Sequence, residues 1–195
     1  MDALKAFLPA PSFSKIKQWI DELDVQVKIT NPRKTKLGDF KGVNNALYIS
    51  VNNNLNPYSF LITLTHELAH AFVYVRYKRG VAPHGTQWQD TFKAMMLNFL
   101  TPTIFPEDIL KVLSLHLKNP KASTLTDVNL ASVLKKYDTN KVLTISDINQ
   151  GQIFSISNGK IFKKGEKLRK RYKCVEVSTN KVYLFHPLAE VSLIQ

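Results

Sequence analysis

Residues 66–70 have the sequence His-Glu-Leu-Ala-His, which is the pattern H-E-x-x-H and suits metal chemistry on a helix. Residues four apart lie one turn apart on the same helical face, so His66 and His70 can offer imidazole nitrogens to one metal ion. Glu67 lies beside them and can accept a proton from a water molecule whose pKa a metal ion has lowered. We therefore predict one catalytic Zn²⁺ ion, with His66 and His70 as ligands and Glu67 as the catalytic base.

A catalytic zinc site also needs a third protein ligand and a position left open for water. His84 is the strongest candidate, because the glycines and proline within residues 80–85 predict a turning connection that can bring it back to the first two ligands. Asp90 and Glu107 stay open as carboxylate ligands, although a solvated charge is the simpler role for Asp90. No histidine stands six residues after His70, which argues against metzincin spacing.

The alternative is that both histidines line a hydrophobic core and that Glu67 is a solvated helix charge. The neighbouring residues oppose this interpretation, because they are largely apolar and an ionisable group in such surroundings needs a partner or a metal. These apolar neighbours are Ile62, Leu64, Leu68, Ala69, Phe72 and Val73. The context therefore favours a metal site.

The metal-binding pattern is predicted to lie on one helix that runs from Pro57 to about Lys78. Asn56 followed by Pro57 is typical of an N-cap with proline at the first helical position, and Gly80 is typical of a helix end. Helical or alternating spacing of apolar residues predicts the other elements. We expect helices over Ser12–Leu23, from Thr86 to before Pro102, over Pro106–Leu117 and around Val128–Lys136, and strands around Val25–Ile29, Lys36–Lys41 and Leu47–Val51, with a turn at Gly42–Asn45.

The composition limits the choice of ligands and of partners. Cys174 is the only cysteine among 195 residues, so a metal site must use His, Asp or Glu. The formal net charge of +12 favours polyanions, nucleic acid among them, as partners. No apolar run approaches the roughly 20 residues of a membrane-spanning helix, and the N-terminus lacks a secretory signal, so we expect a cytoplasmic protein without a membrane partner. The oligomeric state is left open.

A basic segment near the C-terminus is a second candidate site. It contains Lys160, Lys163, Lys164, Lys167, Arg169, Lys170, Arg171 and Lys173, with Glu166 as its single acid. Lysine and arginine can neutralise phosphates, and the interleaved Phe162 and Tyr172 could stack on unpaired bases, so the segment is a candidate nonspecific nucleic-acid interface. A solvated hairpin or a site for an acidic protein are the alternatives.

Alternating segments from about Val142 onward predict a small β unit, with hairpin turns at Asn158-Gly159 and Thr179-Asn180. Apolar packing alone would have to hold this unit together. Its predicted core is Phe154, Ile156, Ile161, Phe162, Val175, Val177, Val182, Leu184 and Phe185.

Three stretches of the sequence resemble the SprT-like family, the relatives of the metalloprotease Spartan. They are the strand Ile49-Ser50-Val51-Asn52, the segment Leu64-Thr65-His66-Glu67-Leu68-Ala69-His70-Ala71, and His84-Gly85-Thr86-Gln87-Trp88. The resemblance covers residues 12–99 well. It implies zinc at His66, His70 and His84, Glu67 as the base, and a connection to DNA-bound proteins or transcription. Many relatives carry a C-terminal zinc ribbon with paired cysteines, and here Cys174 stands alone, so we expect no second structural zinc.

Together these patterns predict an α+β fold with a zincin-like metalloprotease core, in which a small sheet packs on the H-E-x-x-H helix. We expect a SprT-like core at residues 1–118, a linker with a short helix at 119–141, and a small basic β appendage, a degenerate form of the zinc ribbon, at 142–195.

Two functional hypotheses remain. The first is a zinc metalloendopeptidase that hydrolyses peptide bonds of a protein substrate, with DNA-associated proteins as the suggested targets. The second is a non-catalytic, zinc-stabilised module that binds nucleic acid or the transcription machinery. Glu67 discriminates between them, because a purely structural zinc site has no need of a general base and normally closes its fourth position.

Overall fold

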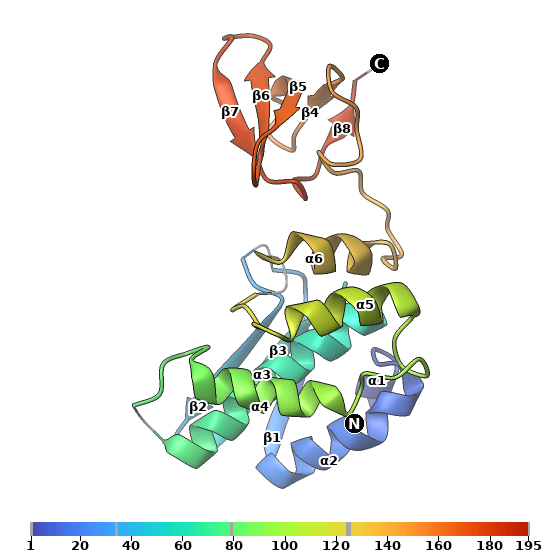
Figure 1. Ribbon diagram of the computed structural model, residues 1–195. Coiled ribbons are helices and arrows are strands. Elements are labelled where there is room, and N and C mark those ends of the chain that lie inside the picture. Colours follow the sequence, from blue (N-terminus) through green and yellow to red (C-terminus); the bar gives the residue numbers. More distant parts are fainter. Residues whose placement is uncertain (1, 34, 79, 124–125, 195) are drawn as a thin grey trace. The chain divides into compact units, whose positions relative to one another are not determined.

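The computed structural model describes residues 2–33, 35–78, 80–123 and 126–194, and the chain divides into two compact units, residues 1–139 and 140–195 (Figure 1). The first unit is an α+β structure, as the sequence predicts. Its elements are α1 (Asp2–Lys5), the 3-10 turn η1 (Ala10–Ser12), α2 (Phe13–Leu23), β1 (Val25–Thr30), β2 (Gly38–Val43), β3 (Ala46–Asn52), α3 (Pro57–Tyr77), α4 (Thr86–Leu97), α5 (Glu107–His116) and α6 (Val128–Lys135).

Helix α2 forms where the sequence predicts it, because its apolar residues recur at helical spacing. Ile16, Trp19, Ile20 and Leu23 are buried, and their neighbours are polar. The helix ends at Asp24, whose backbone is in the left-handed conformation with φ 48°, and this cap turns the chain directly into β1.

The three strands of the first unit form a mixed sheet in the order β1-β3-β2. Strand β3 lies in the centre, parallel to β1 and antiparallel to β2, so β2 is an edge strand. Leu47, Ile49 and Val51 of β3 are buried, and the sheet packs on α3, which confirms the predicted arrangement.

Strand β2 differs from its predicted range. It begins at Gly38 and continues to Val43, two residues beyond the expected end, and the turn is confined to Asn44-Asn45. Both asparagines have positive φ, 49° and 62°, a conformation that asparagine tolerates better than most residues and that two-residue hairpins require. The asparagine pair therefore sets the turn, and Gly42 stays in the strand.

Helix α3 is the centre of the first unit, and it begins and ends close to the predicted positions. The Asn56 side chain accepts a hydrogen bond from the Ser59 backbone N–H at 3.0 Å, and Pro57 occupies the first helical position. Every residue from Phe60 to Ala69 is buried, so this helix is surrounded by other elements on all sides along that stretch.

Helix α6 is joined to the start of α3 by polar contacts as well as by packing. The Asn56 side-chain amide donates to the Leu134 carbonyl at 2.9 Å and to Asp138 Oδ1 at 2.6 Å. Leu130 and Leu134 are buried in the same hydrophobic core as α3. The short helix expected within residues 119–141 therefore belongs structurally to the first unit.

The second unit contains a five-stranded antiparallel sheet in the order β7-β6-β5-β4-β8. The strands are β4 (Ile153–Ser155), β5 (Ile161–Lys167), β6 (Tyr172–Glu176), β7 (Val182–Phe185) and β8 (Ser192–Leu193). The expected hairpin turns are present: Gly159, with φ 81°, lies between β4 and β5, and Asn180, with φ 56°, lies between β6 and β7.

The predicted core of the second unit is only partly correct. Phe154 and Phe162 are buried as expected, and Ile145, Ile148, Cys174 and Val191 complete the core. By contrast, Ile161, Val177, Val182 and Leu184 are 40%, 50%, 54% and 52% exposed. Successive residues of a strand point to opposite faces, so Phe162 points into the core while its neighbour Ile161 points outward. The sequence places apolar residues on both faces, and alternation alone could not identify the buried one.

Among the described residues, no helix is both long enough and apolar enough to cross a membrane.

Candidate metal centre

The structure brings the three histidines together at one point. The Nε2 atoms of His66 and His84 are 3.1 Å apart, those of His66 and His70 are 3.2 Å apart, and those of His70 and His84 are 2.9 Å apart. His66 and His70 lie one turn apart on α3, and His84 comes from the connection between α3 and α4. Within the described parts of the chain, these three residues form the one group of His, Cys, Asp or Glu side chains with metal-ligand spacing.

The separations fit a small tetrahedral ion. With zinc–nitrogen distances of about 2.0–2.1 Å, two tetrahedral ligand nitrogens stand about 3.3–3.4 Å apart. The observed separations are only slightly shorter. Three imidazole nitrogens aimed at one another also have no arrangement of protons that lets every pair hydrogen-bond, whereas a cation accepts all three lone pairs at once. The donor set therefore fits a metal ion.

The electrostatics of the cluster keep these rings neutral, which is the form that binds metal. Burial lowers the pKa of His66 to about 2, and the neighbouring histidines act in the same direction. Burial likewise lowers the pKa of His70 to about 4, with a smaller contribution from His84. Burial also lowers the pKa of His84. The lone pairs are thus free for a cation at neutral pH.

His84 reaches the cluster through an uncommon backbone conformation. Its φ is 61°, in the left-handed region that residues other than glycine rarely adopt. Such a conformation costs on the order of 1–3 kcal/mol and persists where the surrounding structure enforces it, often at functional sites. The Gln89 side-chain amide donates to the His84 carbonyl at 3.4 Å and helps to hold this turn.

Trp88 packs against all three histidine rings. Its ring centroid lies 4.5 Å from that of His66, 5.3 Å from that of His70 and 4.7 Å from that of His84, and the indole is only 1% exposed. The Trp88 indole N–H donates to the His66 carbonyl at 3.4 Å. Trp88 belongs to the stretch His84-Gly85-Thr86-Gln87-Trp88 that carries the family resemblance, but the sequence does not predict that its ring packs on the three histidines.

Glu67 is buried beside the cluster, on the side of the edge strand β2. The backbone N–H of Phe40 donates to its carboxylate, and burial, followed by the negative charge of Asp39, raises the pKa of Glu67 to about 8. Strand β2 passes very close to this side chain. A Cβ atom added to Gly38 would lie 2.6 Å from Glu67 Oε1 and 2.8 Å from both Glu67 Cγ and Thr63 Cγ2, so a larger residue at this position would have to displace these side chains.

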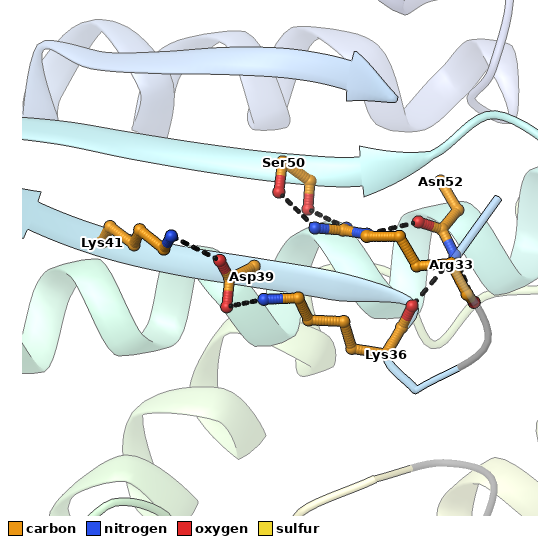
Figure 2. A network of polar contacts seen from close by, with 6 residues as sticks. All are labelled: Arg33, Lys36, Asp39, Lys41, Ser50 and Asn52. Atoms are coloured by element: carbon orange, nitrogen blue, oxygen red, sulfur yellow. Dashed lines mark hydrogen bonds and ion pairs between the residues drawn. The ribbon is translucent and has the colours of Figure 1, made fainter. Parts of the chain in front are cut away.

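A polar network that the sequence patterns did not predict holds the segment leading into β2 (Figure 2). Arg33 donates from Nε to Asn52 Oδ1 at 2.8 Å and from Nη1 to Ser50 Oγ at 2.9 Å, and both partners lie on β3. The Asn52 side-chain amide donates in turn to the Lys36 carbonyl at 2.9 Å. Ser50 and Asn52, two apart on a strand, share a face, and that spacing was the available signal.

Asp39 of β2, the cross-strand partner of Ser50, continues this network. Its carboxylate pairs with Lys36 at 2.8 Å and with Lys41 at 3.7 Å (Figure 2). Although partial burial acts in the opposite direction, the hydrogen bond and charge of Lys36, assisted by Lys41 and Arg33, hold the pKa of Asp39 below its usual value. Asp39 is therefore an ionised neighbour of Glu67.

A polar hollow of about 160 Å³ lies next to His66 and Glu67. Its other walls are Thr35, Lys36, Leu37, Gly38, Thr63, Ala122 and Ser123. Larger hollows of about 480 and 880 Å³ have neither Glu67 nor any of the three histidines in their walls, so size alone does not mark this site.

The two alternative carboxylate ligands lie outside the cluster. Asp90 and Glu107 are exposed, and neither belongs to the metal-like group found among the described residues. His116 is buried at the end of α5, where its Nδ1 lies 2.9 Å from Asp127 Oδ2. His116 therefore has a local partner.

The basic segment of the second unit has side chains in several different environments. Lys164 is 6% exposed, donates to the Ile148 carbonyl, and lies 4.1 Å from the Tyr172 ring centroid. Lys160 pairs with the buried Glu176 at 2.9 Å. The other basic residues are exposed, and these are Lys163, Lys167, Arg169, Lys170, Arg171 and Lys173. The structure thus turns Lys164 inward, away from any phosphate that approaches the surface.

Comparison with protein families gives a match within the first unit. Residues 13–105 match the SprT-like family, and this range contains the three histidines, Glu67 and Gly38. None of the curated proteins and none of the solved structures compared with the chain matches it.

Proposed function

We propose that this chain, whose residues 13–105 form a SprT-like family domain, is a zinc-dependent peptidase that hydrolyses peptide bonds in a protein substrate. The observation that carries the proposal is the convergence of three histidine Nε2 atoms beside one buried carboxylate. This combination supplies a metal position and a proton acceptor within a few residues of each other.

His66, His70 and His84 would hold the zinc ion, and three protein ligands leave a tetrahedral ion one open position. Bound there, the ion supplies Lewis-acid chemistry, because it polarises a peptide carbonyl and makes a water molecule more acidic. Trp88 closes one side of the ligand set and keeps the three rings in place through its packing.

Glu67 is the proposed general base. Its carboxylate would take the proton of the attacking water and then deliver a proton to the leaving amine. Gly38 and the Phe40 N–H fix the direction of the carboxylate. Burial favours its protonated form, whereas a divalent cation held by the adjacent histidines favours the ionised form that the first step needs.

The non-catalytic alternative would need the fourth position to be closed by the protein. Among the described residues, the metal-like group contains three side chains and not four. The buried Glu67 also has no clear role in a purely structural site, because burying a carboxyl group costs free energy unless the group is used or compensated. These two features favour the enzyme.

The test combines metal analysis with cleavage of an unfolded protein such as casein. We expect about one zinc ion per chain, cleavage that a chelator removes and zinc restores, and a roughly 10²–10⁴-fold loss of activity in Glu67→Gln with zinc content unchanged. Glu107→Gln, an exposed glutamate, is the matched control and should keep full activity. Equal cleavage by wild type and Glu67→Gln would rule out the proposed mechanism.

A second proposal concerns the exposed basic residues of the second unit. We propose that they bind nucleic acid nonspecifically and that this binding brings the enzyme to DNA-associated substrates. Six cationic side chains within residues 163–173 are exposed to solvent, and such side chains can neutralise phosphates without reading sequence.

Titration of a fluorescent oligonucleotide at several salt concentrations tests this second proposal. Neutralising Lys163, Arg169, Lys170 and Arg171 should weaken binding and reduce the salt slope by roughly 0.7–0.9 for each phosphate that the variant no longer neutralises. Lys164 is left in place because it is buried. Neutralising Lys15, Lys17, Lys28 and Lys41 of the first unit is the matched control. Equally weakened binding in both variants would show that net charge alone, and not the basic segment, determines the affinity.

A further inference from the structure

A second hollow opens beside the histidine cluster, and its walls are apolar. Its volume is about 150 Å³, and it is formed by β2, α3, the α3–α4 connection and α4. We propose that this apolar pocket receives a hydrophobic side chain of the polypeptide substrate next to the scissile bond, and so selects where the chain is cut. The residues that define the pocket are Phe40, His70, Val73, Tyr77, Val81 and Trp88.

The walls of the apolar pocket are hydrophobic and held in place. Val73 is buried, and Phe40 packs edge-on against Tyr74 with ring centroids 5.6 Å apart. Trp88 stacks on His70 at 5.3 Å. His70 is neutral, and the charged lining residue, Lys78, is exposed to solvent, as are Tyr74 and Tyr77, so the inner walls formed by Val73 and Trp88 offer an incoming polar group little compensation. The pocket therefore favours a side chain without charge or hydrogen-bonding groups.

The position of the apolar pocket makes it part of the catalytic site. Its wall includes His70, whereas the polar hollow includes His66 and Glu67. Strand β2 lines both, because Gly38 belongs to the polar hollow and Phe40 to the apolar pocket. Two strand residues span about 6.6 Å, which is also close to the spacing of alternate residues in an extended substrate. A peptide held at the histidine cluster can thus place one side chain in each hollow.

The size of the pocket limits the side chains it can accept. A dry cavity of about 150 Å³ lined by hydrophobic residues is large enough for a benzene-sized group. Leucine, isoleucine, methionine and phenylalanine side chains are of about this size or smaller, so we expect them to be accepted. A hydrophobic pocket distinguishes side chains by roughly 10–200-fold for each methylene group or its equivalent, so leucine should be preferred over glycine by at least tenfold.

This inference rests on the proposed function, and its test measures binding as well as activity. Glycine hydroxamate and leucine hydroxamate share a zinc-chelating group and differ only in the side chain. Calorimetric titration of the zinc-loaded full chain with each compound gives the ratio of the two dissociation constants. We expect leucine hydroxamate to bind at least tenfold more tightly to the wild type.

Two variants fill the apolar pocket, and a third is the control. Val81→Trp and Ala82→Phe each place a larger side chain at a lining residue. Because Ala82 is exposed, we expect Ala82→Phe to fold even if Val81→Trp does not. Val75→Trp adds the same bulk to an exposed α3 residue outside the pocket lining. The ratio should fall to about one in the two filled variants and stay at the wild-type value in Val75→Trp.

The outcomes separate the two proposals. If the wild type binds zinc and both hydroxamates equally well, or if both filled variants keep the ratio, the apolar pocket is not a side-chain site. If the wild type binds no zinc, the proposed function fails and this inference fails with it. Mapping of casein cleavage sites by mass spectrometry is a second, independent measurement. In the wild type, hydrophobic residues should be enriched at one fixed position next to the cleaved bond. This enrichment should disappear in Val81→Trp.

Discussion

The first unit places a buried carboxylate, Glu67, beside the buried His66 and the half-buried His70, whose rings meet at one point, whereas the second unit buries one lysine and one glutamate that already have partners. In the second unit, Lys164 donates to a backbone carbonyl, and Glu176 accepts from Thr179 and pairs with Lys160. In the first unit, His66 and His70 meet only other ligand nitrogens at their Nε2 atoms. A buried polar group that is satisfied within the protein supports structure, and several that converge on one point indicate a ligand.

The largest effect expected from this comparison is loss of metal from the first unit. His84→Ala removes the third nitrogen and leaves two ligands, so zinc binding should fall by several orders of magnitude and peptidase activity should disappear. Zinc content after dialysis measures the change. His186→Ala removes a histidine of the second unit and should leave zinc content unchanged. Equal zinc content in His84→Ala and wild type would exclude His84 as a ligand.

The second unit should be broken instead by a change in its small core. Phe154 is fully buried against Phe162 and Phe185, with ring centroids 5.7 and 5.4 Å away, so Phe154→Ala should lower the free energy of unfolding by about 3–5 kcal/mol. Val182→Thr, on the exposed face of the same sheet, should change it by less than about 0.5 kcal/mol.

Denaturant unfolding of both variants measures the difference, and the zinc content of the first unit serves as the internal reference. A large loss of stability in Val182→Thr would show that the outer face of the sheet is covered in the native protein.

A smaller change should impair the first unit without unfolding it. In Gly38→Ala the new methyl group meets the Glu67 carboxylate, and a displacement of about 1 Å can lower the rate roughly 100-fold. Val43→Ala, at an exposed position of the same strand outside both hollows, is the control. We expect kcat to fall in Gly38→Ala only, with zinc content unchanged in both. Equal activity in the two variants would contradict the positioning role of Gly38.

The smallest expected effect is a difference in pH dependence between the units in the metal-free protein. His66 and His70 have pKa values of about 2 and 4 when folded, against 6.5 for an unperturbed histidine, so the unfolded chain binds more protons and stability falls as the pH drops below about 6.5. Glu67 acts oppositely: its pKa is about 8 when folded and 4.5 when unperturbed, so its contribution to stability is fully present below about pH 4.5 and is lost as the pH rises to about 8.

Below pH 6.5 the two histidines outweigh the one glutamate, and above pH 6.5 only the glutamate changes the stability, so the metal-free first unit should be most stable near pH 6.5. In the second unit, hydrogen bonds from Thr179 and Lys160 lower the pKa of Glu176, so its contribution is present above pH 4.5 and is lost only below that value. Denaturant unfolding at pH 5, 6.5 and 8 distinguishes the units, and zinc should remove the dependence in the first. A flat profile for the metal-free first unit would contradict the assigned environments.

The sequence predicted those features that depend on local periodicity. Helix α3 and its pair of histidines follow from a four-residue spacing and an N-cap, which neighbouring residues determine. The contact between Gly38 and Glu67 could not be predicted, because it depends on how closely β2 approaches α3. The predicted core of the second unit was partly wrong for a related reason. Ile161 and Phe162 are both apolar, and only the folded sheet decides which of them is buried.

The packing of Trp88 on the three ligand rings gives the protein an optical reporter of its own metal content. The chain has two tryptophans, and Trp19 lies against Phe99, with ring centroids 5.4 Å apart. With Trp19 replaced by phenylalanine, the indole emission comes from Trp88 alone. A cation bound by the three histidine rings that contact this indole changes the electric field at the excited indole. The fluorescence intensity of Trp88 should therefore report the metal occupancy of the site without an added label.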